Sequence, residues 1–256
     1  MPVNVPLKLN VKDSQQTIAV VGDIHAPYHD AKVINLVWKF LKETQPEYLI
    51  LNGDICDFYQ ASKFDKDPAR MAGLSEDIEL TRKILATFRD ILPDTKIILI
   101  SGTHEHRWEK FLWSGVPIVS NIGCLSIQQL YGLDKLEIEY VPYEKGLLIN
   151  KVFLVLHGNF TSIHSAYTAK RMYEKHGGCG MCNHTHRGGS FYKTDRFGTW
   201  GWWENFCLCR LDPDWIMNPN WQHGFSLIHF TNHSRFWVES IPIIDYKMLY
   251  GGSLRG

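Results

Sequence analysis

Carboxylate and imidazole side chains directly follow several apolar runs of this 256-residue chain. One loop, Asn52-Gly53-Asp54-Ile55-Cys56-Asp57, carries two carboxylates three residues apart after the apolar run 48–51. Because a carboxylate has two oxygens, Asp54 could bind two cations at once. Alone, this loop is explained equally well as a turn, since Asp and Gly favour turns after strands. The rest of the chain repeats the pattern, which favours a functional site.

Eight residues share this placement: Asp23, His25, Asp54, Asp57, His104, His157, His184 and His186. Five of them are histidines, out of twelve in the chain. A single histidine of this kind is more often structural, but five joined to three carboxylates are hard to explain by packing. Imidazole suits zinc, iron, copper or nickel, and carboxylate extends the range to manganese and magnesium. The set therefore predicts a metal site.

Three strand–helix units would position the first of these residues. The apolar, β-branched runs 17–21, 48–51 and 96–100 predict buried strands. Helices are expected over 31–44, capped by Asp30, and from a Ser75 cap to Leu92. Each run is followed by a glycine turn and polar residues. Parallel strands bind ligands at their carboxyl ends, so the polar residues are expected to meet there.

The second half of the chain predicts mainly strands. A short helix is expected over 125–131 and a longer one over 162–175. Strands are expected over 136–140, 146–149, 152–156, 224–230 and 235–244. The segment 188–256 is predicted to form aromatic-rich closing strands and loops. No convincing linker interrupts the chain. We therefore expect one domain over 1–256 with a mixed sheet core.

Composition narrows the class of protein. Apolar residues make up 45% and charged residues 21% of the chain, as in an ordinary globular protein. The 27 basic and 27 acidic residues balance, which disfavours long nucleic acids without excluding a local basic patch. No apolar run reaches a membrane span, and residues 1–5 lack the features of a signal peptide. The expected location is the cytoplasm, with no membrane partner.

Six cysteines are expected to be reduced thiols in a cytoplasmic protein of this size. Cys179, Cys182, Cys207 and Cys209 have residue types that could form a tetrahedral zinc site. Alternate small residues in an apolar run more often simply pack. Packing is therefore the favoured interpretation, and the zinc site stays an alternative.

Five blocks of the chain resemble, in order, those of the calcineurin-like metallophosphoesterase family. They are Gly22-Asp23-Ile24-His25, Gly53-Asp54-Ile55-Cys56-Asp57, Gly102-Thr103-His104-Glu105, His157-Gly158 and Asn183-His184-Thr185-His186. Each block is common, but together they are specific, and the motifs fall within 22–187. The aromatic-rich end of the chain is similar to phage-type members. The resemblance implies a four-layer α/β/β/α sandwich with two mixed β-sheets and a metal site at the strand C-terminal ends.

The resemblance also implies a dinuclear, metal-dependent phosphoesterase. In the family pattern the first metal would be held by Asp23, His25 and His186, the second by His157 and His184, and both by Asp54. A metal-bridging hydroxide would attack phosphorus in line. His104 would protonate the leaving oxygen as general acid or steady the transition state, and Asp57 would hold its ring.

Three departures from the family pattern bear on this expectation. Thr103 stands where the family usually has a metal-binding Asn, and a neutral hydroxyl is a poorer, shorter ligand, so the second site is expected to be weaker. Asn183 replaces the usual Gly, and Asn183 or Asn159 could restore an oxygen ligand. Asp57 is followed by Phe58, not by the Arg-Gly of the Ser/Thr protein phosphatase branch, which disfavours a phosphoprotein substrate.

Arg107 and Arg187 follow the histidine motifs and could each hold a phosphate oxygen. A plain surface charge explains either one as well. The aromatic block containing Phe197, Trp200, Trp202, Trp203, Trp215 and Trp221 could stack on bases. A second-sheet core or a dimer surface is the favoured interpretation, because aromatics dominate cores and interfaces.

The expected activity is therefore hydrolysis of phosphate esters, with diesters, nucleotide-like or synthetic, favoured over monoesters. A phosphomonoesterase or protein phosphatase using the same site is the alternative enzyme. A degenerate binding scaffold is the alternative outside catalysis, and Thr103 is the feature that supports it. Manganese is the first expectation for the two cations, with iron, zinc, nickel and cobalt open. A homo-oligomer is also left open.

Overall fold

The computed structural model describes residues 6–12, 14–68, 73–214 and 216–256. Its helices are α1 Ala31–Thr44, α2 Leu74–Ile91, α3 Thr103–Gly115, α4 Ile127–Tyr131 and α5 Tyr167–His176. Its strands are β1 Leu7–Leu9, β2 Gln16–Val21, β3 Tyr48–Leu51, β4 Lys96–Ile100, β5 Ile138–Val141, β6 Leu147–Ile149, β7 Phe153–Val155, β8 Cys179–Cys182, β9 Gly188–Asp195, β10 Gly198–Asn205, β11 Gly224–Phe230, β12 Phe236–Pro242, β13 Met248–Tyr250 and β14 Ser253–Arg255.

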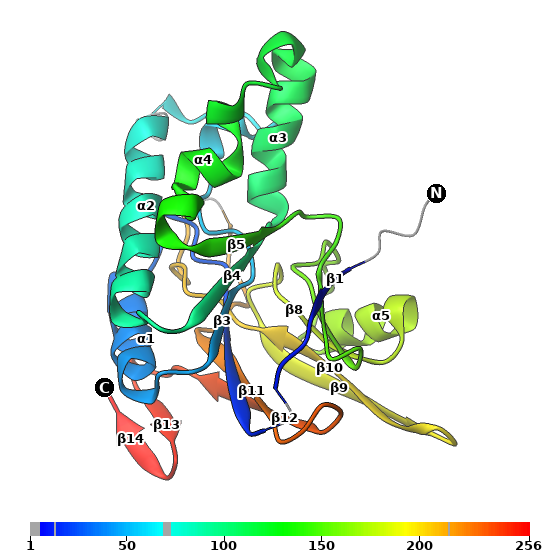
Figure 1. The fold of residues 1–256 in the computed structure, drawn as a ribbon. Coiled ribbons are helices and arrows are strands. Elements are labelled where there is room, and N and C mark those ends of the chain that lie inside the picture. The colour runs from blue at the N-terminus through cyan, green and yellow to red at the C-terminus, as the bar shows by residue number, and fades with distance from the viewer. Residues whose placement is uncertain (1–5, 13, 69–72, 215) are drawn as a thin grey trace.

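The first large sheet has the strand order β12-β11-β2-β3-β4-β5 (Figure 1). Its strands from β2 to β5 are parallel, and β11 and β12 continue it in antiparallel fashion. The three predicted strands of the first half are therefore neighbours, so their carboxyl ends share one edge of the sheet. This edge carries the loops that follow β2, β3 and β4.

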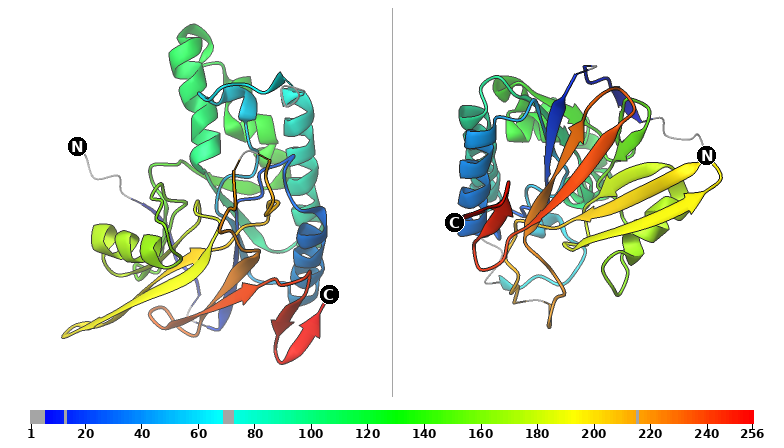
Figure 2. Two further views of the ribbon diagram at one scale, coloured as in Figure 1. Left: turned by 180° about the vertical axis from the view of Figure 1, so that it is seen from behind. Right: turned by 90° about the horizontal axis from the view of Figure 1, so that it is seen from below.

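The second large sheet has the order β1-β6-β7-β8-β10-β9 and is also mixed. The β7–β8 and β8–β10 pairs are parallel, whereas β6–β7 and β9–β10 are antiparallel. The β9–β10 ribbon projects beyond the body of the molecule (Figure 2). The loops after β7 and β8 leave this sheet toward the first one.

Three apolar clusters divide the fold into four layers. Between the sheets, Ile18 and Ile50 of the first pack with Phe153 and Met181 of the second. The other face of the first sheet packs against α1, α2 and α4, and the other face of the second packs against α5. The predicted four-layer α/β/β/α sandwich with two mixed sheets is confirmed (Figure 1).

Helix ends follow local chemistry, with some corrections. Asp30 caps α1 as predicted, accepting the N–H groups of Lys32 and Val33 at 2.9 and 3.1 Å. The predicted Ser75 cap is wrong, because α2 begins at Leu74, which follows a left-handed Gly73, and Ser75 lies inside its first turn. The expected helix start at 162 is also wrong, since α5 begins only at Tyr167.

Helix α3 was not predicted. Its first turn consists of the polar residues that follow β4, and such residues at a strand end were interpreted as a functional loop, not as the start of a helix.

Among the described helices, none combines the length and apolar character needed to cross a lipid bilayer. One domain over 1–256 stays a prediction.

Candidate metal centre

Loops from both sheets bring all eight predicted residues to one place. The loop after β2 carries Asp23 and His25, and the loop after β3 carries Asp54 and Asp57. His104 lies in the first turn of α3, directly after β4. The loops after β7 and β8 supply the remaining three, His157, His184 and His186. The carboxyl ends of strands in two sheets therefore converge on a common centre.

Left-handed backbone directs these side chains inward. Five of the residues have φ between 49° and 75°: Asp23, His25, Asp54, His184 and His186. Because β2 ends at Val21, Asp23 and His25 do not alternate along a strand, and their side chains meet through the turn that follows it. Such conformations are strained for non-glycine residues and concentrate at functional sites. Main-chain hydrogen bonds hold them, including one of 2.9 Å from the His25 N–H to the Asp54 carbonyl.

Gly53 permits the close approach of two loops. It has φ of 80°, and a Cβ there would lie 2.5 Å from the Cα of Gly102 and 2.7 Å from the Nδ1 of His157. A side chain at this position would push the loop that carries Asp54 away from α3 and from the second sheet. The glycine is thus required both for its backbone conformation and for the space it leaves.

The first group of converging ligand atoms consists of Asp23, His25 and His186. The Nε2 atoms of the two histidines are 3.0 Å apart. They lie 3.9 and 3.7 Å from the Oδ1 of Asp23. The Nδ1 of His25 is 3.2 Å from the Asp57 carboxylate, which orients the ring so that Nε2 faces the group.

The second group consists of Asp54, His157 and His184. The Nε2 of His157 lies 3.1 Å from the Oδ2 of Asp54, while its Nδ1 lies 2.7 Å from the carbonyl oxygen of Asn52. This is the arrangement typical of a metal-binding histidine, whose second nitrogen is held by the protein. The Thr103 hydroxyl donates to Asp54 Oδ2 at 3.0 Å and lies 3.4 Å from the Nδ1 of His184. Thr103 therefore sits beside this group.

The two groups adjoin at Asp54. Its Oδ2 is 3.8 Å from the Nε2 of His25 in the first group and 3.1 Å from that of His157 in the second. The Oδ1 of Asp23 and the Nε2 of His157 are buried, and neither makes a hydrogen bond among the described residues, although the latter lies 3.1 Å from Asp54 Oδ2. Buried polar atoms without partners are costly, and a cation would satisfy both. The donor set therefore fits bound divalent metal.

Burial and neighbouring charges set the protonation of the ligand groups differently across the centre. Burial raises the pKa of Asp23 to about 6, with the charge on Asp54 adding to the effect and that on His157 opposing it. Burial acts to raise the pKa of Asp54 too, but the charge on His157 helps to hold it well below its usual value. Burial lowers the pKa of His184 to about 4 and that of His186 well below the ordinary range. Neutral imidazoles keep the lone pair that a metal needs. Burial acts to lower the pKa of His157, but the charge on Asp54 raises it to about 10, so this ring must release a proton when a cation binds.

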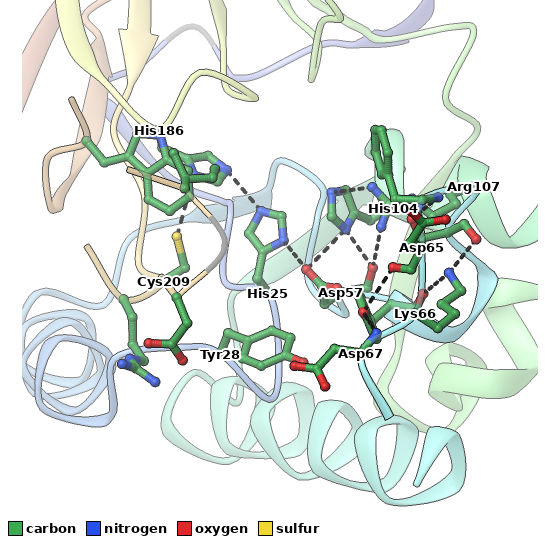
Figure 3. Close-up of a pocket in the computed structure, with 17 residues that line it drawn as sticks. His25, Tyr28, Asp57, Asp65, Lys66, Asp67, His104, Arg107, His186 and Cys209 are labelled. Atoms are coloured by element: carbon green, nitrogen blue, oxygen red, sulfur yellow. Dashed lines mark hydrogen bonds and ion pairs between the residues drawn. The ribbon is translucent and has the colours of Figure 1, made fainter. Parts of the chain in front are cut away.

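His104 stands at the open side of the centre together with Asp57. Its Nδ1 lies 2.6 Å from the main-chain oxygen of Asp57 and 3.4 Å from the carboxylate. Figure 3 shows the Asp57 carboxylate between the rings of His25 and His104. Its two histidine neighbours hold the pKa of Asp57 well below the usual value, although burial opposes this. Arg107, one helical turn later, donates to the Nε2 of His104 at 3.0 Å and to the Asp57 carbonyl at 3.1 Å.

Arg187 occupies a different environment from Arg107. Its guanidinium donates to the carbonyl oxygens of Ser162 and Asn220, which ties two loops together. Asn183 is buried, and its amide hydrogen-bonds to Asn52 and Asp23 at 2.8 and 3.1 Å. It thus supports the centre rather than facing it. Asn159 is exposed at the surface.

Glu105 is a supporting residue that sequence reasoning missed. It is fully buried, and its Oε2 accepts the N–H groups of Asp54 and Gly102, each at 2.9 Å. Its Oε1 accepts the Ile55 N–H at 2.9 Å and the Tyr131 hydroxyl at 2.8 Å. One carboxylate therefore fixes the loop of Asp54 against the start of α3. Its place directly after His104 in a motif was the only signal in the sequence.

The substitution Glu105→Gln is expected to destabilise the protein by about 2–5 kcal/mol, because an amide nitrogen cannot accept the buried N–H groups. The midpoint of thermal unfolding, followed by circular dichroism, should fall by roughly 5–15 °C. Glu109→Gln on the same helix, at a partly exposed position, is the control and should melt like the parent protein. Equal melting of Glu105→Gln and the parent would contradict this role.

A second buried carboxylate, Glu204 of β10, supports the other side of the centre. It accepts the Thr185 hydroxyl at 2.7 Å and the N–H groups of Thr168 and Ala169 at 3.1 and 3.2 Å. Thr185 lies between two of the converging histidines. Glu204 thereby joins their loop to the first turn of α5, a link between residues far apart in the sequence.

The four cysteines considered for zinc do not gather. Cys179 and Cys182 are three apart on β8, so their side chains point to opposite faces and pack in different clusters. Cys207 and Cys209 lie near His186, and the Sγ of Cys209 is 3.6 Å from its Nδ1. The packing interpretation therefore holds for the first pair, and Cys209 contacts the ring of a centre histidine.

A cavity of about 800 Å³ opens above His25, Asp57, His104 and His186. The described residues of the aromatic block lie in different environments, and only some of them are near this cavity. Trp202 and Trp203 are buried in apolar clusters, as the core interpretation predicted, and Phe197 is exposed at the β9–β10 turn. Trp221, in contrast, lines the cavity with its ring centroid 4.2 Å from that of His186. Trp215 lies outside the described residues.

Comparison with known proteins places the chain among phosphoesterases. The family model described as "Calcineurin-like phosphoesterase" matches residues 16–237. The Gene 54 proteins of Mycobacterium phages D29 and L5 are 24% and 25% identical, each over 92% of this chain and 96% of the relative. A solved structure of Vps29 from Entamoeba histolytica complexed with zinc is 13% identical, with a TM-score of 0.48 over 93% of this chain and 96% of that one.

Proposed function

The chain belongs to the calcineurin-like phosphoesterase family, and we propose that it hydrolyses phosphate esters at a centre of two divalent cations. One observation carries this proposal. Two groups of ligand atoms adjoin at Asp54, and buried polar atoms in both groups lack hydrogen-bond partners within the described structure. Such an arrangement matches a two-metal site, in which adjacent cations clamp a phosphate.

The proposed ligands follow the two groups. Asp23, His25 and His186 would hold one cation, His157 and His184 the other, and Asp54 both. Thr103 would be a weak ligand of the second cation, because its neutral hydroxyl on a short side chain is a poorer ligand than a carboxylate or an imidazole. When bound, the cations supply positive charge for the phosphate and lower the pKa of water. Manganese is the proposed metal, with iron, zinc, nickel or cobalt as alternatives.

The chain's own residues would complete the reaction. His104 faces the cavity and is proposed to give a proton from Nε2 to the leaving oxygen, which requires that Arg107 has moved away and that Nε2 is protonated. Asp57 would orient it, since both its carbonyl and its carboxylate lie near Nδ1. Arg107 lines the same cavity and would bind a phosphate oxygen by moving its Nη2 from His104 to the substrate. Arg187 as a phosphate ligand stays a prediction.

We favour phosphodiesters over phosphomonoesters as substrates. The cavity is wide enough for a second ester group, at about 800 Å³. A phosphomonoesterase or protein phosphatase is the alternative on the same residues. A nucleotide-like substrate, a cytoplasmic location, the lack of a membrane or long nucleic acid partner, and a homo-oligomer stay predictions.

The test is hydrolysis of bis-p-nitrophenyl phosphate beside p-nitrophenyl phosphate by metal-stripped protein to which manganese is returned. We expect faster cleavage of the diester, abolished by a chelator. Faster cleavage of the monoester would instead assign a phosphatase. Bound metal with cleavage of neither ester would favour a binding scaffold and point to Thr103 as the cause.

A further inference from the structure

We propose that the substrate is a compact ester with a single phosphate and a flat aromatic group, not a polynucleotide. The proposal rests on the phosphoesterase function above and concerns the walls of its cavity. The floor carries His25 and His186 of the candidate metal centre, with Asp57 and His104 beside them (Figure 3). One wall is the loop after β3, from Tyr59 to Asp67, and the other is formed by Cys209, Arg210, Asp214, Ile216 and Trp221.

An apolar surface adjoins the reacting position. Trp221 contacts His186 edge to face, and the planes of the two rings make an angle of 67°. Ile216, five residues before Trp221, is 41% exposed, and Phe64 on the opposite wall is 79% exposed. All three line the cavity. A phosphate at the centre would thus place its organic group against an indole and two exposed apolar side chains, a surface suited to a planar ring.

The charges around the cavity favour one phosphate only. Among the described residues, its lining contains three cationic side chains, Lys66, Arg107 and Arg210, against four carboxylates, Asp57, Asp65, Asp67 and Asp214. Nucleic-acid channels instead follow the backbone with an excess of positive charge.

Two of the cationic side chains also have partners within the protein. Lys66 donates to the carbonyl oxygens of Tyr59 and Ser62, and Arg210 pairs with Asp212 at 3.2 Å. Asp65 and Asp214 are exposed on opposite walls. A second phosphate extending from the centre would meet these carboxylates. The cavity is therefore complementary to an ester with a neutral, aromatic group.

The first test varies only the group that does not leave. Methyl p-nitrophenyl phosphate and phenyl p-nitrophenyl phosphate share one leaving group, so their ratio of kcat/KM reports recognition of the phenyl ring. With manganese bound, we expect the phenyl ester to be favoured by roughly tenfold. Trp221→Ala should reduce this ratio toward one.

Matched variants separate recognition from folding. Trp237→Ala removes a tryptophan that is 57% exposed on β12 and should leave the ratio unchanged. If Trp221→Ala does not fold, Ile216→Ala at an exposed position takes its place and should lower the ratio in the same direction. A ratio near one in the parent protein, or an unchanged ratio in a folded Trp221→Ala, would overturn the proposal while leaving phosphoesterase activity established.

The second test adds a charge to the substrate. Thymidine 5′-(p-nitrophenyl phosphate) is compared with the same compound carrying a 3′-phosphate, and the extra phosphate should lower kcat/KM. The double variant Asp65→Asn/Asp214→Asn should recover this loss by up to roughly tenfold, about threefold for each carboxylate. Asp90→Asn/Asp94→Asn, at exposed positions near the end of α2, is the control.

Two outcomes of this comparison would count against the proposal. Preference for the doubly charged substrate by the parent protein would overturn it in favour of a polynucleotide. Cleavage of none of the four esters by metal-loaded protein would overturn the phosphoesterase function itself, so the two failures are distinguishable.

Discussion

The substitution Asp54→Ala is expected to abolish metal binding and ester hydrolysis together. Asp54 is buried and is the residue at which the two ligand groups adjoin. Without its carboxylate, four histidines and Asp23 would have to bind two dications with one negative charge among them. Metal content measured by plasma mass spectrometry should fall below the parent's, and hydrolysis should fall to the uncatalysed rate.

Asp54 also supports local structure, so a second variant that keeps this structural role is needed beside Asp54→Ala. Its Oδ1 accepts the N–H of His104 at 2.7 Å, which holds the start of α3. Asp54→Asn keeps an acceptor oxygen for this hydrogen bond but loses the charge. We expect Asp54→Asn to fold and still to be inactive, whereas Asp90→Asn at an exposed site should behave as the parent. Activity retained in a metal-free Asp54 variant would refute the metal-dependent mechanism.

The substitution His104→Ala should lower kcat by about 10²–10⁴-fold on esters of alkyl alcohols, which need a proton on departure. The loss should be much smaller for p-nitrophenyl esters, because p-nitrophenolate leaves without protonation. Metal content should persist, since His104 belongs to neither group that adjoins at Asp54. Steady-state kinetics over a series of leaving groups measures this difference.

His164→Ala, at an exposed histidine, is the control for this experiment and should retain the parent's rates. An equal loss for good and poor leaving groups would exclude His104 as general acid and assign it to binding or to transition-state charge. Loss of metal in His104→Ala would show instead that the ring belongs to the metal site.

Much of the first sheet could be predicted from local sequence. The apolar runs at β2, β3 and β4 are short and uninterrupted, and a glycine follows each of them closely. Both the strands and their ends could therefore be predicted from the sequence. Asp30 caps α1 because a cap depends only on its next few neighbours. Helix α3 was missed because its first turn is made of the residues that carry the chemistry.

The candidate site was predicted in composition but not in construction. All eight residues converge, but through left-handed turns rather than by continuing strands. The supports at Glu105 and Glu204 were not seen, since an isolated Glu gives no signal of being buried. Arg107 faces the cavity while Arg187 ties loops together, although both follow histidine motifs.

The sequence by itself determined the family, the strand ends and the identity of the polar residues, because each depends on neighbours along the chain. Only the tertiary structure decided how these residues meet. The Oδ2 of Asp54 and the Nε2 of His157, 3.1 Å apart, come from different sheets. Tertiary packing also placed Trp221 at the cavity while burying Trp202. The sequence does not distinguish one tryptophan from another. The elements that pack against each side chain decide whether it lies in the apolar core or lines the cavity.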